Sequence, residues 1–394
     1  MDTQFIKKDA LGPEYVTFVY DSKIGMEGIL VIDNTVLGPG KGGIRMTPDI
    51  TQEEIFRLAR AMTLKNAISG IPFGGAKAGI IWKGGPDQLK KQYIQSFAEA
   101  IKIFTPKKYV AGPDVNTGER EMKWFVETTG RWKSATGKPT NLCMKIFGKP
   151  GEKCGIPHEF GSAGFGVAEA TAVAAEFAGI ELKKSIVAIH GFGNVGSFVY
   201  TFLTKLGAKV VAIADKNGVV FSEQGFERKK LEFLIKEKKS IMEYKGGKII
   251  ESNDFWNLPI DIIIPASVTD VINEKNKNLI RAKIIVEAGN ISMGEKVEEE
   301  LFQRGILIVP DIVANAGGVI SSFTEYRGYN PKRMFEIIKQ KISRNTKFIL
   351  RKSKEKNLSP RIVAEEIAKK RVWEAMRKRK ISKKRLRRSD LFTC

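Results

Sequence analysis

The fold is decided by the segment SIVAIHGFGNVG, residues 185–196. An apolar run rich in β-branched residues, typical of a buried strand, leads directly into Gly191, Gly193 and Gly196, and a helical pattern then continues to about Gly207. Glycines at this spacing between a strand and a helix form a turn where the backbone approaches a pyrophosphate, and the helix N-terminus stabilises its negative charge. The segment therefore predicts a dinucleotide-binding α/β domain.

A second strand-like segment, residues 209–215, ends in an acidic residue that is placed to accept a hydrogen bond from a ribose hydroxyl. Two further short strands, residues 261–265 and 283–287, are expected to continue a parallel sheet. The residues expected to bind the dinucleotide at the turn and at the strand end are Gly191, Gly193, Asn194, Val195, Gly196 and Asp215.

The chain has 394 residues, which is long enough for two domains with separate cores. We expect residues 1–155 to form an α/β substrate-binding and catalytic domain and residues 156–325 to form the Rossmann-like domain. Residues 326–394 are expected to be helices that return to the first domain, ending in a basic tail. The loss of periodicity between Gly130 and His158 predicts the connection between the two domains.

Helix signals support this division. Thr51 opens a capping box before an amphipathic pattern that runs to about Ile68, and a second such pattern covers residues 87–104. Near the C-terminus, Pro331 and Pro360 each follow a capping residue and so predict the first turns of two long helices.

The cysteine and histidine content argues against a metal centre. Cys143, Cys154 and Cys394 are odd in number and none lies close to another in the sequence, so we expect free thiols, with neither a disulfide nor a zinc site. His158 and His190 are the only two histidines, which leaves lysine and carboxylate groups for proton transfer. With no apolar segment of membrane-spanning length and no secretory signal, we expect a cytoplasmic protein.

The net charge of +22 is concentrated near the C-terminus. Between Lys369 and Arg388, twelve Lys and Arg residues stand against one acid, Glu374. A nucleic-acid-binding role for this tail is one alternative, but only Trp373 is available for base stacking, so we expect a solvated helix instead.

The strongest candidate for chemistry is the segment PFGGAKAG, residues 72–79. Its glycines let the backbone approach a small ligand, and its surroundings are apolar. A lysine denied water has a lowered pKa and acts as an acid or base near neutral pH. Lys77 is therefore the candidate catalytic residue.

Five segments in a fixed order resemble those of the glutamate dehydrogenase family, within the wider group of glutamate, leucine, phenylalanine and valine dehydrogenases. They are KGGIR (residues 41–45), LKN (64–66), GGAKAG (74–79), AGPD (111–114) and NAGGV (315–319). The resemblance covers most of the chain and implies a two-domain enzyme with a cleft between the domains.

The resemblance also implies roles for single residues. Lys77 matches the catalytic lysine, and Asp114 matches the acid that exchanges protons with ammonia and the imino intermediate. Lys65 matches the lysine that binds the substrate α-carboxylate, whereas Lys41 and Ser322 match the residues at its side-chain carboxylate. Repulsion from Lys41 and Lys65 is expected to help lower the pKa of Lys77.

The implied reaction is the oxidative deamination of L-glutamate to 2-oxoglutarate and ammonia, and its reverse, with NAD or NADP. Asn290 and Asn315 match residues that line the cofactor. Asp215 disfavours the 2′-phosphate of NADP, whereas Lys216 favours it, so we expect NAD by a small margin. The alternative substrates are leucine, valine and phenylalanine, but their enzymes carry an apolar residue where this chain has Lys41. Family members are usually homohexamers.

Three residues depart from the family pattern. Met62 stands where glutamine is frequent, Ala163 where threonine is common, and Ala78 where glycine is usual. The first two positions touch substrate and nicotinamide in the family, and methionine and alanine lack the hydrogen-bonding groups of glutamine and threonine.

Overall fold

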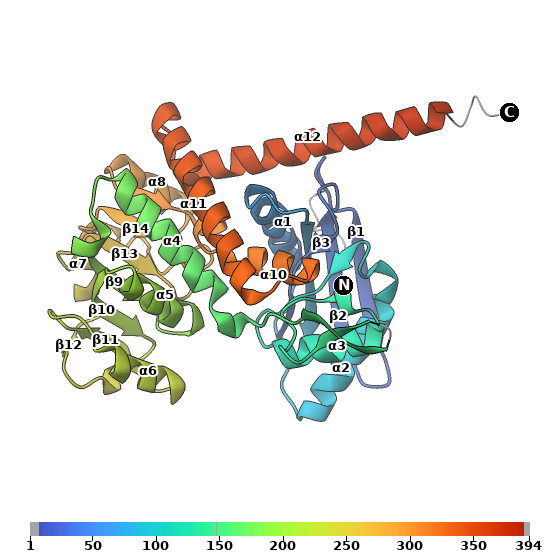
Figure 1. Ribbon diagram of the computed structural model, residues 1–394, viewed down its shortest axis with the longest axis horizontal. Coiled ribbons are helices and arrows are strands. Elements are labelled where there is room, and N and C mark those ends of the chain that lie inside the picture. The colour runs from blue at the N-terminus through green and yellow to red at the C-terminus, as the bar shows by residue number, and fades with distance from the viewer. Residues whose placement is uncertain (1–7, 147, 390–394) are drawn as a thin grey trace. The chain divides into compact units, whose positions relative to one another are not determined.

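The computed structural model describes residues 8–146 and 148–389, which form two compact units (Figure 1). Both units are α/β, which confirms the predicted fold class. Unit 1 comprises the described residues within Met1–Phe160, Val319–Met334 and Glu365–Cys394, and unit 2 comprises Gly161–Gly318 and Phe335–Ala364.

The C-terminal region is divided between the units, whereas the sequence predicted that all of it returns to the first domain. Most of helix α11 (Pro331–Lys356) belongs to unit 2. The reason is aromatic packing, because the ring of Phe335 lies 4.9 Å from that of Phe165 and 6.0 Å from that of Phe202, both in unit 2.

Unit 1 is built on a six-stranded sheet with the order β1-β2-β5-β3-β6, in which β4 also pairs with β5. Strands β1, β2 and β5 are antiparallel neighbours, whereas β3 and β4 run parallel to β5. The strands are β1 (Tyr15–Asp21), β2 (Met26–Asn34), β3 (Gly40–Lys41), β4 (Ile44–Thr47), β5 (Gly74–Ile81) and β6 (Tyr109–Val110).

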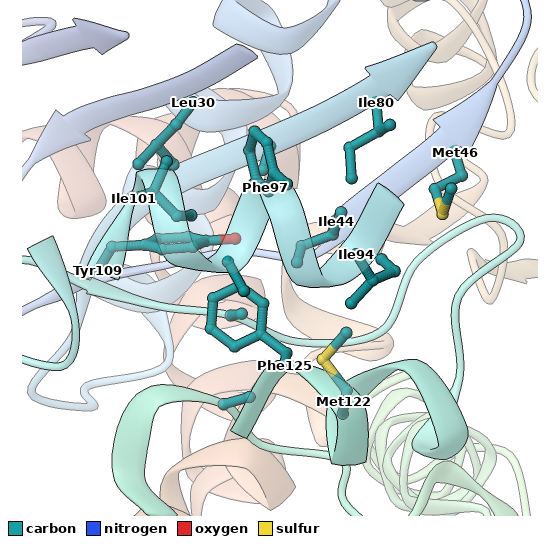
Figure 2. Packing of buried hydrophobic residues seen from close by; sticks show 14 of the residues in the cluster. Leu30, Ile44, Met46, Ile80, Ile94, Phe97, Ile101, Tyr109, Met122 and Phe125 are labelled. Carbon is teal, nitrogen blue, oxygen red and sulfur yellow. The ribbon is translucent and has the colours of Figure 1, made fainter. Parts of the chain in front are cut away.

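The two faces of this sheet are covered by different helices. Helices α2 (Asp87–Ala100) and α3 (Glu119–Thr129) enclose the main core, where Phe97 and Phe125 pack near Ile80 of β5 (Figure 2). Helix α1 (Gln52–Ile68) covers the other face and begins where predicted, with Thr51 accepting a hydrogen bond from the Glu54 amide.

Side chains alternate along β5, and this places the candidate lysine. Ala76 and Ala78 point into the core with α2 and α3. A Cβ atom at Gly79 would lie 2.8 Å from Ile55 of α1, and one at Gly75 would overlap the α1 backbone. Since residues two apart share one side of a strand, Lys77 faces α1.

Unit 2 is a seven-stranded sheet with the order β12-β11-β10-β9-β13-β14-β15, in which β10, β9, β13, β14 and β15 are parallel. This order confirms the Rossmann-like prediction. The strands are β9 (Ile186–His190), β10 (Lys209–Asp215), β11 (Gly218–Phe221), β12 (Lys248–Ile250), β13 (Ile262–Pro265), β14 (Ile284–Val286) and β15 (Leu307–Val309).

Helices cover both faces of the unit 2 sheet. Helices α4 (Ser162–Phe177) and α5 (Asn194–Lys205) pack together on one face. On the other, α7 (Asp254–Asn257) and α8 (Glu295–Gln303) enclose a core with the alternate strand residues Ala188, Ile263, Ile285 and Ile308.

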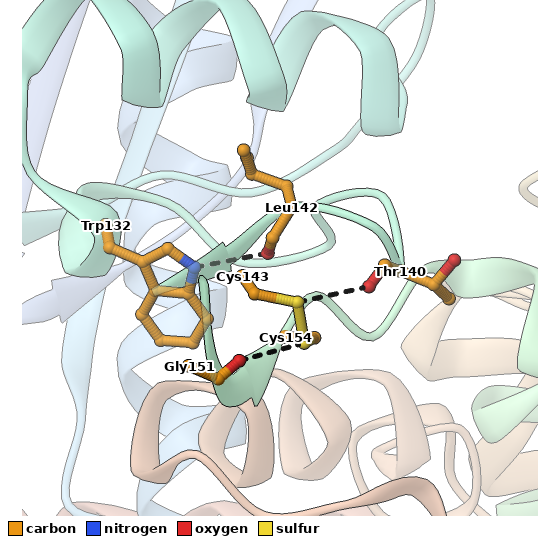
Figure 3. Close-up of a disulfide and its surroundings, with 6 residues drawn as sticks. All are labelled: Trp132, Thr140, Leu142, Cys143, Gly151 and Cys154. Atoms are coloured by element: carbon orange, nitrogen blue, oxygen red, sulfur yellow. Dashed lines mark hydrogen bonds between the residues drawn. A yellow bond between two sulfur atoms is a disulfide. The ribbon is translucent and has the colours of Figure 1, made fainter. Parts of the chain in front are cut away.

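The free-thiol prediction is wrong for two of the three cysteines, because Cys143 and Cys154 form a disulfide (Figure 3). They lie on the antiparallel strands β7 (Cys143–Ile146) and β8 (Lys149–Cys154), whose register places them directly opposite each other. The pairing depends on this hairpin, which occupies part of the segment expected to be a featureless connection. Cys394 lies outside the described residues.

The disulfide predicts the outcome of thiol labelling. Protein purified without reductant, unfolded and alkylated is expected to incorporate label at no more than one of its three cysteines. Prior reduction is expected to expose all three, as mass spectrometry would detect. Labelling of Cys143 and Cys154 without reduction would contradict the pairing.

Candidate functional site

Glycines bring three segments of unit 1 together around Lys77. A side chain at Gly42 would overlap the backbone carbonyl of Ala76, so β5 and the segment after β3 touch directly. A Cβ atom at Gly43 would lie 2.8 Å from that of Asp114, so the same segment also touches the loop after β6. Only glycine permits both approaches.

Asp114 is held between two cations. One carboxylate oxygen pairs with the Lys77 ammonium, which is 5% exposed, and the other accepts a hydrogen bond of 2.8 Å from Arg45 Nε. Arg45, on β4, also pairs with Glu54 on α1. The sequence alone indicated no role in this site for Arg45, which ends the segment KGGIR, or for Glu54, which it placed only in the capping box of α1.

These contacts set the protonation of the pair. Burial lowers the pKa of Lys77, while the charge of Asp114 opposes this change and the charge of Arg45 adds to it. Burial alone would raise the pKa of Asp114, but Lys77 and Arg45 outweigh this effect and hold the pKa at about 2. Asp114 is therefore anionic at neutral pH, and Arg45 is the main cation that repels Lys77.

Lys41 is a second buried ammonium group, 3% exposed, whose Nζ donates a 2.8 Å hydrogen bond to the carbonyl of Ala111. Burial lowers the pKa of Lys41 to about 7, and Glu325 is the group that most strongly opposes the decrease. Lys77 and Asp114 also act on Lys41, so the structure brings these three predicted residues into one electrostatic group.

The other two predicted substrate residues lie on neighbouring helices. Lys65 is in the last turn of α1, two residues after Thr63, whose backbone packs against Gly75 of β5. Ser322 is partly exposed on α10 (Gly317–Arg327). Unit 1 holds this helix through Phe73, whose ring makes edge contacts with those of neighbouring α10 residues, Phe323 and Tyr326.

The predicted dinucleotide turn in unit 2 has room for a ligand at one glycine only. Gly191 has a φ of +113°, and a Cβ atom at this position would meet the Ala266 carbonyl at 2.6 Å, while one at Gly196 would overlap the Gly191 carbonyl. A Cβ at Gly193 would meet nothing within 4 Å. Gly193 caps α5 without a side-chain hydrogen bond, so the first amides of this helix suit a phosphate group.

Two asparagines lie at the carboxyl edge of the same sheet. The Asn315 amide nitrogen donates hydrogen bonds of 3.1 Å to the Ala288 carbonyl and to Asn290 Oδ1. Asn315 Oδ1 is buried, and no donor among the described residues reaches it. A buried oxygen without a hydrogen-bond donor suits a site where a bound ligand supplies that donor, as expected for a cofactor-binding residue.

Asp215 also shapes its own turn. Its carboxylate accepts hydrogen bonds of 2.7 Å from the Asn217 amide, 2.7 Å from the Ser240 hydroxyl and 2.8 Å from the Ile241 amide. The sequence predicted only a ribose contact and did not indicate these bonds.

A cluster around Arg361 supports the asparagine loops and was missed in the sequence. Arg361, in the first turn of α12 (Pro360–Ser389), pairs with Glu287, Glu298 and Asp311. Asp311 accepts a 3.2 Å hydrogen bond from the Ile291 amide, and its own amide donates to Glu287 at 3.0 Å. Burial raises the pKa of Glu287, the charge of Arg361 opposes this increase, and the two acidic neighbours add to it.

A buried lysine–aspartate site in one α/β unit and a dinucleotide-type turn in the other define the chain as a nicotinamide-dependent dehydrogenase. Residues 14–131 match the family description "Glu/Leu/Phe/Val dehydrogenase, dimerisation domain", and residues 154–380 match "Glutamate/Leucine/Phenylalanine/Valine dehydrogenase". The chain belongs to the Glu/Leu/Phe/Val dehydrogenase family.

Individual relatives agree with this assignment. The chain is 34% identical to the NADP(+)-dependent glutamate dehydrogenase of Pyrobaculum calidifontis, over 90% of this chain and 86% of the relative. It is also 34% identical to the NAD-specific glutamate dehydrogenase of Clostridioides difficile, over 74% and 70%. The crystal structure of glutamate dehydrogenase from Peptoniphilus asaccharolyticus is 27% identical with a TM-score of 0.78, covering 93% of this chain and 92% of that chain.

The Arg361 cluster predicts a pH-dependent loss of stability. Arg361→Met leaves buried carboxylates without a cation and is expected to lower the free energy of unfolding by about 3–5 kcal/mol near neutral pH. Arg361 opposes the increase in the pKa of Glu287, so its removal raises that pKa further. The folded variant then gains more from protonation than the unmodified protein does, and the loss is expected to shrink as pH falls.

Urea unfolding at two pH values measures this effect. Lys347→Met, which removes an exposed partner of Glu176 in the same unit, is the control and is expected to cost less than about 1 kcal/mol. Equal losses in the two variants, or a loss that grows toward acid pH, would contradict the assignment.

Proposed function

We propose that the protein catalyses the oxidative deamination of L-glutamate to 2-oxoglutarate and ammonia, and the reverse reaction, with NAD or NADP. The observation that carries this proposal is the buried Lys41 ammonium beside the Lys77–Asp114 pair. The similarity to enzymes named glutamate dehydrogenases supports it.

Lys77 and Asp114 are proposed to move the protons. A bound nicotinamide dinucleotide supplies the hydride acceptor. The Lys77 ammonium first transfers its proton to Asp114. Neutral Lys77 then takes a proton from the water that attacks the imine, and Asp114 passes the proton it received to the departing amine. The two steps are coupled, because loss of the Lys77 proton removes one of the cations that hold the pKa of Asp114 down.

The substrate is proposed to be held at both carboxylates, by Lys65 at the α-carboxylate and by Lys41 with Ser322 at the distal one. This arrangement fixes the α-carbon for transfer. An apolar amino acid would leave the buried Lys41 ammonium without a partner, which disfavours leucine, valine or phenylalanine as substrates.

Unit 2 is proposed to hold the dinucleotide. Gly191, Gly193, Asn194, Val195 and Gly196 would bind the pyrophosphate, and Asn290 and Asn315 would line the nicotinamide ribose. We infer a preference for NAD, since the carboxylate of Asp215 would repel a 2′-phosphate at this strand end.

We infer a homo-oligomer, with a hexamer as the proposed size, in the cytoplasm. Among the described strands, β1 is at the edge of its sheet and exposes Tyr15, Phe18 and Tyr20. This edge suits a second copy of the chain. Among residues 8–146 and 148–389, no helix has the length and apolar character needed to cross a membrane. None of the relatives described above favours the nucleic-acid alternative for the basic tail.

A panel of L-amino acids assayed with NAD and with NADP, followed by absorbance of the reduced cofactor, tests the function and the cofactor preference together. Glutamate with NAD is expected to give the highest kcat/KM. A higher value for leucine, valine or phenylalanine would refute the proposed substrate, and a higher value with NADP would refute the preference alone.

Lys77→Ala is expected to lower kcat by at least about 100-fold, the usual contribution of a positioned acid–base group, while dinucleotide affinity is unchanged. Stopped-flow absorbance measures hydride transfer, and fluorescence quenching measures dinucleotide binding. Turnover close to that of the unmodified enzyme would remove Lys77 from the mechanism.

A further inference from the structure

We propose that the buried ion pair of Lys138 and Glu325 positions Lys41 and maintains its charge, and thereby makes the distal site selective for a substrate carboxylate. This inference rests on the proposed function, because Lys41 is assigned there to the distal carboxylate. Neither Lys138 nor Glu325 has a role in the proton transfers proposed above.

The pair is built into the core of unit 1. Both side chains are 0% exposed, and Lys138 Nζ lies 2.5 Å from Glu325 Oε1. The Lys138 ammonium also lies 3.9 Å from the ring centroid of Trp132, and Glu325 Oε2 accepts a 2.7 Å hydrogen bond from the Gly137 amide. Each charge is therefore compensated and fixed in place.

Hydrogen bonds and a short backbone segment, residues 136–138, join this pair to Lys41. The Ala111 carbonyl accepts the bond from Lys41 Nζ, at 2.8 Å, and also one from the Thr136 amide, at 3.0 Å. Thr136 is followed by Gly137 and Lys138, which bind Glu325. The backbone that holds the Lys41 ammonium is thus the backbone that the ion pair anchors.

The pair is also linked to the distal site through helix α10. Glu325 lies three residues after Ser322 on α10, so the two residues are on one side of the helix, one turn apart. Ser322 is the other residue proposed to contact the distal carboxylate. One ion pair therefore fixes both proposed contacts of that carboxylate.

The charges around Lys41 explain why Glu325 is needed. Five titratable groups act on Lys41: Glu325 on α10, Lys138 after α3, Lys77 on β5, Asp114 after β6 and His158 in a single turn that follows β8. Glu325 raises the pKa of Lys41, whereas Lys138 and Lys77 lower it. Without Glu325, Lys41 would lie beside two cations and would release its proton at lower pH.

The pair itself carries no net charge. Glu325 supports the protonated form of Lys41, and Lys138 cancels the repulsion that Glu325 alone would exert on an incoming carboxylate. The positive charge left over at the distal site is that of Lys41. An acidic side chain is therefore attracted, while an apolar one gains nothing.

The test compares L-glutamate with L-norvaline, which has a methyl group in place of the distal carboxylate. Lys77 and Lys65 are proposed to act on groups that both substrates have. Their contributions therefore cancel in the ratio of the two kcat/KM values. In the unmodified enzyme this ratio is expected to fall as pH rises through about 7, because Lys41 then loses its proton.

Glu325→Gln is expected to shift the decrease in this ratio to lower pH. At pH values above the pKa of Lys41, each pH unit of that shift lowers the ratio about tenfold. Glu325→Asp keeps the carboxylate and is expected to restore most of the ratio. Lys41→Leu supplies the limiting ratio without an ammonium group. Glu127→Gln, at an exposed partner of Lys123 in the same unit, is the matched control and is expected to change nothing.

An unchanged ratio at every pH in Glu325→Gln, with both substrates affected equally, would overturn the inference and leave the pair a structural role only. If Glu325→Gln fails to fold, the ratio in Glu325→Asp and Lys138→Arg decides, since a structural role predicts no change in its pH profile. A failure of the unmodified enzyme to oxidise glutamate would instead refute the proposed function.

Discussion

The burial of ammonium groups is the constraint on which the site of unit 1 depends. Transfer of a charged group out of water costs several kcal/mol unless hydrogen-bonding partners replace the water. Lys41, Lys77 and Lys138 are each at most 5% exposed, and each meets a different acceptor: the Ala111 carbonyl, Asp114 and Glu325. The loop after β6 and helix α10, which supply these acceptors, must therefore lie beside the buried lysines.

The sequence predicted the parts of the structure that depend on local rules. Strand alternation, the capping box at Thr51 and the glycine turn at residues 191–196 all involve neighbours in the chain, and the elements form where expected. Lys77 became a candidate for the same reason, because its glycine-rich surroundings are visible in eight consecutive residues. A glycine-rich sequence indicates that another segment packs closely against the backbone there, but it does not show which segment this is.

Partners distant in the sequence left no such signal. Arg45 and Asp114 are 69 residues apart, and Lys138 and Glu325 are 187 apart, so neither pair follows from spacing or composition. The Cys143–Cys154 disulfide was missed because its hairpin begins in a segment without strand periodicity. Arg361 was missed because a single arginine at a helix start is ordinary, and only the fold brings it to three carboxylates.

The partner of each lysine also accounts for the role that we propose for that lysine. Lys77 faces a carboxylate that can take up a proton, so charge moves within the pair and the group suits acid–base chemistry. Lys41 faces a carbonyl that cannot, so its charge is stable only while Glu325 or a substrate carboxylate supports it. In the proposed mechanism these two lysines therefore have different roles: Lys77 carries a proton, and Lys41 selects for a substrate carboxylate.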